Sequence, residues 1–86
     1  MIEFNSEAFS RLVAQSAGLR GSGRFREAAA LLEGSLPEMH ADCLTNAYLE
    51  IFYAYKEAGD RESASRYARL LYQLDPGLPS IQEFMQ

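Results

Sequence analysis

The chain of 86 residues is poor in several features, and each shortage narrows its class. A single cysteine excludes an internal disulfide and leaves a covalent dimer through Cys43 as the only disulfide hypothesis. No apolar run approaches the roughly 20 residues that a membrane-spanning helix needs. The start of the chain carries Glu3 and Glu7, where a secretory signal has positive charge followed by an apolar run. We therefore expect a cytoplasmic protein that does not contact a membrane.

Positive charge and histidine are also scarce, with eight Lys and Arg against twelve Asp and Glu, and one His. A net charge of −4 argues against nucleic acid as a partner. The segment RGSGRFR lacks both the GxxxxGK[ST] pattern and a preceding strand, so it predicts a hairpin turn and not a phosphate-binding loop. The group of Glu38, His40, Asp42 and Cys43 has no second Cys or His for zinc, and no third residue to orient a Cys–His nucleophile. We expect no enzyme activity, metal or cofactor.

No segment alternates apolar and polar residues as a half-buried strand does, whereas helical spacing recurs along the chain. The spacing predicts helices over residues 6–20, 24–34 and 60–74, with a third helix ending at Ala58. That third helix starts either near Leu36 or near Asp42. Leu36 follows Ser35, a good capping residue, and Asp42 is itself a good cap. Ser80 to Glu83 has the spacing of a capping box and predicts a short terminal helix. The expected fold is all-α.

Particular residues mark the helix ends. Gly23 and Gly59 are expected to terminate helices, because glycine adopts positive φ at little cost. Asp60 is the expected cap of the next helix, and Ser35 with Glu38 forms a second capping box. The buried stripe expected on the fourth long helix comprises Ala64, Tyr67, Ala68, Leu71 and Leu74. The arginines of that helix, which are Arg61, Arg66 and Arg69, are expected to pair locally with acids.

The two glycines also anchor an internal repeat, because they lie 36 positions apart and their surroundings match. Large apolar residues lie eleven and four positions before each glycine, and an alanine lies five positions after each: Leu12 and Tyr48, Leu19 and Tyr55, Ala28 and Ala64. Self-similarity near this period is typical of stacked helical hairpins.

On these residues the chain resembles the tetratricopeptide repeat (TPR) family. The second unit carries the pattern well, through Tyr48, Ile51, Tyr55, Gly59-Asp60, Ala64, Leu71, Leu74 and Asp75-Pro76. It departs at Phe52, where the family has a small residue, and at Ala68, where the family has an aromatic one. The first unit is more divergent, with Gln15 and Ser16 in place of Leu-Gly. The resemblance implies one TPR-like domain over residues 1–86, with two stacked antiparallel hairpins over about 6–36 and 42–76, and a capping segment over 78–86. An unrelated four-helix bundle is the alternative architecture.

The segment AYLEIFYAY, residues 47–55, contains six large apolar residues within eight positions. Successive helical residues turn by about 100°, so these side chains cannot all share one face. After the inward-facing ones are placed, Leu49 and Tyr53 remain. The TPR resemblance implies that these two line the concave face where ligands bind. Their counterparts in the first unit are Val13 and Ala17, and the residues nearby are Ser10, Arg20, Asn46, Lys56 and Glu57.

Two coverings are open for Leu49 and Tyr53: the terminal segment of the same chain, or a protein partner. The leading hypothesis is a small adaptor or chaperone that holds a helix or peptide against Val13, Ala17, Arg20, Asn46, Leu49, Tyr53 and Lys56. The alternative is a structural domain that associates with a second copy of itself as a homodimer. Neither hypothesis requires a cofactor or nucleic acid.

Overall fold

The computed structural model describes residues 6–85, which fold into helices joined by short turns. The helices are α1 (Ser6–Gly21), α2 (Phe25–Glu33), α3 (Ala41–Glu57), α4 (Arg61–Leu74) and α5 (Pro79–Met85), with a 3-10 turn at Leu36–Glu38. Over this part of the chain there is no strand, which confirms the all-α prediction. No helix among these residues is both long and apolar enough to cross a bilayer.

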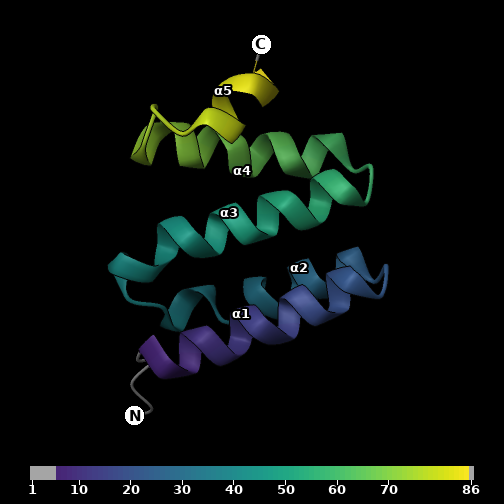
Figure 1. The fold of residues 1–86 in the computed structure, drawn as a ribbon. Coiled ribbons are helices and arrows are strands. Elements are labelled where there is room, and N and C mark those ends of the chain that lie inside the picture. Colours follow the sequence, from purple (N-terminus) through teal and green to yellow (C-terminus); the bar gives the residue numbers. More distant parts are fainter. Residues whose placement is uncertain (1–5, 86) are drawn as a thin grey trace.

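The helices follow one another up the molecule, and α1 and α5 lie at opposite extremes (Figure 1). Helix α1 packs on α2, α2 on α3, α3 on α4 and α4 on α5, while α1 also contacts α3. Because three helices pack directly against α3, it supplies several of the most deeply buried residues. The large side chains with full burial are Leu32, Ile51, Phe52, Leu71 and Ile81.

The turns that close the two hairpins share one hydrogen-bonding pattern. Gly23 has a φ of 79° and Gly59 a φ of 78°, and both have left-handed backbone that other residues adopt at a cost. The N–H of the residue after each glycine reaches back over the helix end, from Arg24 to the Leu19 carbonyl at 2.9 Å and from Asp60 to the Tyr55 carbonyl at 3.0 Å. These are Schellman-type endings, and they confirm the predicted role of both glycines.

The helix starts are confirmed in one case and wrong in two. Asp60 caps α4, because its carboxylate accepts a hydrogen bond from the Ser63 N–H at 3.1 Å. Ser35 makes no side-chain cap bond, although a 3-10 turn does follow it. Ser80 is not a cap either, because α5 begins one residue earlier at Pro79 and the Ser80 hydroxyl contacts another helix.

A helical element begins at or near both of the starts expected for the third helix. The segment near Leu36 forms only the short 3-10 turn, and the long helix begins at Ala41, one residue before Asp42. Its N-cap is His40, which makes no side-chain cap bond. The predicted stripe of α4 is right at four of its five positions, but Leu74 is 54% exposed. Leu74 is the last residue of α4 and lies beyond the end of the hydrophobic core.

Candidate functional site

The seven residues expected to bind a partner lie on α1 and α3, two helices that contact each other. We call this surface the α1–α3 face, and it consists of Val13, Ala17, Arg20, Asn46, Leu49, Tyr53 and Lys56. Val13, Leu49 and Tyr53 are half-buried and pack against the core, whereas Ala17, Asn46 and Lys56 are exposed. The face therefore combines partly covered apolar area with polar side chains at its margin.

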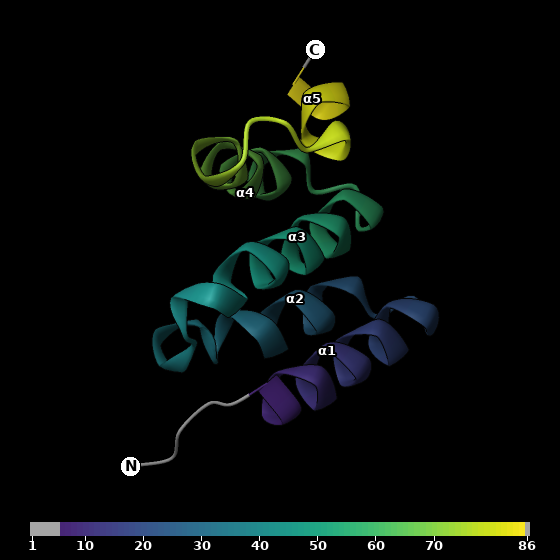
Figure 2. The same cartoon turned by 60° about the vertical axis from the view of Figure 1, so that its left-hand side comes forward.

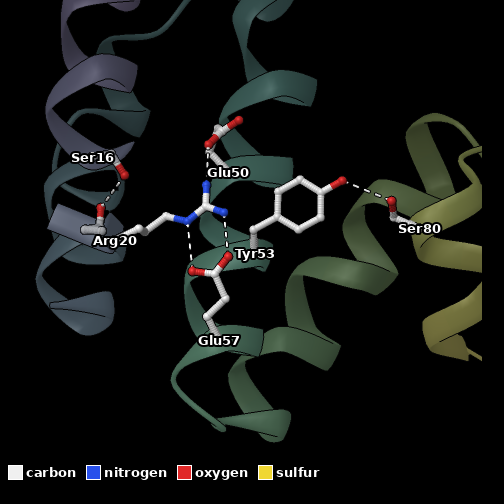
Figure 3. A network of polar contacts seen from close by, with 7 residues as sticks. Ser16, Arg20, Glu50, Tyr53, Glu57 and Ser80 are labelled. Atoms are coloured by element: carbon white, nitrogen blue, oxygen red, sulfur yellow. Dashed lines mark hydrogen bonds and ion pairs between the residues drawn. The ribbon is translucent and has the colours of Figure 1, made fainter. Parts of the chain in front are cut away.

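Arg20 is the centre of a polar network that links α1 to α3 (Figure 3). One guanidinium nitrogen lies 2.9 Å from a Glu50 carboxylate oxygen, and two others donate to Glu57 at 2.6 and 3.2 Å. The guanidinium also lies 5.5 Å from the centre of the Tyr53 ring, within cation–π range. The positive charge of Arg20 is thus neutralised by intramolecular ion pairs, so this side chain is not free to bind a partner.

The protonation states follow from this pairing. The hydrogen bond from Arg20 lowers the pKa of the Glu57 carboxyl, and the same bond raises the pKa of Arg20. Both groups are therefore charged at neutral pH. The Glu57 side chain is 39% exposed, so solvent screens this pair and its contribution to stability is modest.

Tyr53 connects the same network to α5. Its hydroxyl lies 3.0 Å from the Ser80 Oγ (Figure 3). Its ring centre is 5.7 Å from that of Phe52. The terminal helix therefore covers one side of Tyr53, while the residue as a whole stays half-buried. The sequence left two candidates for covering Tyr53, the terminal segment and a protein partner. The terminal segment covers at least part of this side chain.

Sequence reasoning placed Glu57 near this face without assigning it a contact, and it did not assign Glu50 or Ser80 to the site. Glu50 and Glu57 are seven positions apart, which is two helical turns, so a shared face was available as a signal. That their common partner would be Arg20 depends on how α1 lies against α3. Ser80 was assigned to a cap, and its bond to Tyr53 has no sequence signal.

A second polar network joins the two hairpins on the other side of α3. The hydroxyls of Tyr55 and Tyr67 both donate to the Glu33 carboxylate, each at 2.6 Å. The two rings stack with centres 6.1 Å apart. Burial, with the bond to Glu33, raises the pKa of Tyr55 to about 12 and raises that of Tyr67 as well, so both phenols remain donors. Glu33 of α2 thus holds α3 and α4 against the first hairpin.

The arginines of α4 contradict the expected local pairing. No described acid lies within ion-pair distance of Arg61, Arg66 or Arg69, whereas all four arginines of α1, α2 and the turn between them have such a partner. Arg69 has no acid three or four positions away in the sequence. The acid four positions before Arg61 is Glu57, which already binds Arg20. The Arg61 guanidinium lies instead over the Phe84 ring, at 4.8 Å.

His40 is exposed and Cys43 is half-buried at the start of α3. Across residues 6–85, no group of three or more His, Cys, Asp and Glu is arranged to hold a metal ion. What the α1–α3 face offers chemically is apolar contact area and hydrogen bonding. No family model, curated protein or solved structure matches the chain.

Proposed function

We propose that the chain is a non-enzymatic protein-interaction module, a small TPR-like adaptor or chaperone that binds a helix or extended peptide on its α1–α3 face. The TPR-like arrangement is supported by the two matching turns 36 residues apart and by the contact between α1 and α3, the first helices of the two hairpins. In a stack of helical hairpins the first helices of neighbouring units lie side by side and line one surface.

The observation that carries the proposal is the incomplete burial of Leu49 and Tyr53 on α3, while Ala17 is exposed on α1, a helix that contacts α3. The two hairpins thus both contribute apolar side chains that the described helices leave partly uncovered. Tyrosine suits such a position, because it offers a large ring and a hydroxyl at small cost in conformational entropy.

The chemistry of the partner is constrained by Arg20. Because Glu50 and Glu57 neutralise it, the face has no spare guanidinium to grip a carboxylate. The proposed partner therefore presents an apolar side chain to Leu49 and Tyr53, and polar groups to Asn46 and Lys56 at the margin.

The substitution Tyr53→Ala tests the proposal against a partner isolated from the native host. We expect the affinity to fall by more than about 1 kcal/mol, roughly fivefold, because a central aromatic residue is removed. Tyr53→Phe is the matched control, since it keeps the ring and loses only the hydroxyl bond to Ser80. Unchanged affinity together with a sharply lower melting temperature would mean that Tyr53 belongs to the core.

Self-association is the second candidate, and exposed apolar residues of α4 favour it. Leu70, Tyr72 and Leu74 are 37%, 48% and 54% exposed. Leu70 and Leu74 are four positions apart and share a face of α4, so a homodimer through that face would cover both. Sedimentation over a range of concentrations measures the mass directly, and a monomer at high micromolar concentration would contradict this candidate.

A further inference from the structure

A shallow groove between α4 and α5 is lined by two arginines of α4 and by apolar side chains of α5. Its volume is about 260 Å³, and it is lined by Arg61, Ser65, Ala68, Arg69, Phe84 and Met85. We call it the α4–α5 groove; it lies where the two last helices run beside each other (Figure 2). It is a different surface from the α1–α3 face, with which it shares no residue.

The two arginines of the groove are available to a ligand. Neither Arg61 nor Arg69 has an ion-pair partner among the described residues, in a chain whose net charge is −4. The Arg61 guanidinium lies 4.8 Å from the centre of the Phe84 ring, a contact that leaves its N–H groups without a hydrogen-bond acceptor there. Arg69 is exposed. Two guanidinium groups without an ion-pair partner among the described residues therefore line one groove.

Apolar side chains form part of the groove lining, beside Ser65. Met85 is 48% exposed and the Phe84 ring is half-buried, with Ala68 buried beneath. The groove therefore combines two cations of α4 with apolar side chains that α5 contributes.

The spacing identifies the shape of the ligand. Arg61 and Arg69 are eight residues apart, which corresponds to about 12 Å along a helix. When the two side chains extend side by side from these positions, that separation suits two carboxylates better than one. Alternate residues of an extended peptide point the same way, and positions four apart are about 13 Å distant, so two acidic side chains at that spacing match the two arginines.

From this geometry we infer that the α4–α5 groove binds an acidic protein segment in extended conformation, with carboxylates at positions i and i+4 and an aliphatic side chain at i+2. The carboxylates accept hydrogen bonds from Arg61 and Arg69, and the aliphatic side chain contacts Phe84 and Met85. A polynucleotide is disfavoured, because the net negative charge of the chain repels a polyanion along its whole length.

The test uses the full chain and a fluorescent peptide that contains Glu-Ser-Leu-Ser-Glu, with binding followed by anisotropy. Two matched peptides carry Gln in place of both Glu, or the two Glu three positions apart. We expect the first peptide to bind with a dissociation constant below about 1 mM and the other two to bind more weakly. Equal binding of all three peptides, or no binding of the first, would overturn the inference.

Protein variants locate the site. Arg69→Gln should weaken binding of the first peptide by about fivefold, the upper range for an exposed charge pair. Arg66→Gln is the matched control, because it removes the same charge from the same helix outside the groove and should change binding by less than about twofold. Equal losses in both variants would indicate non-specific attraction and contradict the site.

Tyr53→Ala separates this inference from the proposed function. The α4–α5 groove does not include Tyr53, so this variant should bind the acidic peptide as the parent chain does. If Tyr53→Ala abolished peptide binding while Arg69→Gln preserved it, the peptide would occupy the α1–α3 face and the groove would be excluded as its site.

Discussion

The two hairpins end their first helices in the same way but differ at the position that faces inward. Ser16 of α1 and Phe52 of α3 lie 36 residues apart, at equivalent distances before Gly23 and Gly59, and both are fully buried. Ser16 donates a hydrogen bond to the Ala28 carbonyl at 3.2 Å, which ties α1 to α2. Phe52 meets Phe84 edge-on with ring centres 5.0 Å apart, which ties α3 to α5.

This difference shows that the turn and the interior have separate roles. The repeated turn sets where each chain segment reverses, whatever residue lies inside. The interior residue sets which neighbour the helix holds, since a small Ser16 leaves room for a backbone contact within its own hairpin. A large Phe52 extends beyond its hairpin and gives the terminal helix a surface on which to pack.

The largest expected effect comes from truncating the larger of these two residues. Phe52→Ala should lower the free energy of unfolding by about 3–5 kcal/mol, because it leaves a cavity and removes the contact with Phe84. Ser16→Ala, at the equivalent position, should cost about 1 kcal/mol through the lost hydrogen bond. Urea unfolding followed by circular dichroism measures both. Equal costs would show that the two interiors are energetically alike and that the comparison fails.

A smaller and equal effect is expected at the two turns. Gly23→Ala and Gly59→Ala should each lower the free energy of unfolding by about 1–2 kcal/mol, because both glycines have positive φ. An added Cβ meets no atom within 4 Å at either site, so backbone strain is the only cost.

The control for these turns is Gly18→Ala in the interior of α1. There the added Cβ also finds open space, and alanine should stabilise the helix by about 0.5–1 kcal/mol. Thermal unfolding of the three variants separates the expectations. A cost at only one of the two turns would mean that the hairpins do not share a common ending.

The smallest effect distinguishes the two hairpins by pH. Hydrogen bonds from the Ser63 backbone and side chain, with Arg26 nearby, lower the pKa of Asp60, whereas the equivalent residue of the first hairpin is Arg24. A lowered pKa adds stability above the usual Asp pKa near 4, and that stability is lost as the pH falls through the lower folded value. Asp60→Asn keeps a capping oxygen but does not titrate. Its unfolding midpoint should therefore fall less than that of the parent chain below about pH 4. Parallel pH profiles would contradict this role for Asp60.

Much of the fold was predictable because it depends on short-range signals. The ends of the hairpin helices follow from Gly23, Gly59 and Asp60, whose turn and capping hydrogen bonds involve residues within about five positions. The failures involve the same kinds of residue where a distant partner intervened. Ser80 has the sequence of a cap but bonds to Tyr53, 27 residues away, and Leu74 has the spacing of a core residue but lies where the core ends.

The candidate surfaces divide in the same way. The sequence identified Leu49 and Tyr53 as surplus apolar residues, because helical geometry alone forbids all six large side chains from sharing one face. It gave no sign that Arg20 would pair with carboxylates 30 and 37 positions away, or that Arg61 and Arg69 would have no ion-pair partner among the residues that the structure describes. Residue types and local spacing thus determined the helices, their turns and the repeat. Only the packing of α1 on α3 and of α5 on α4 decided which of the described charged side chains form ion pairs and which do not. Coulomb and hydrogen-bond energies depend on distances between helices, and these distances do not exist until the helices pack.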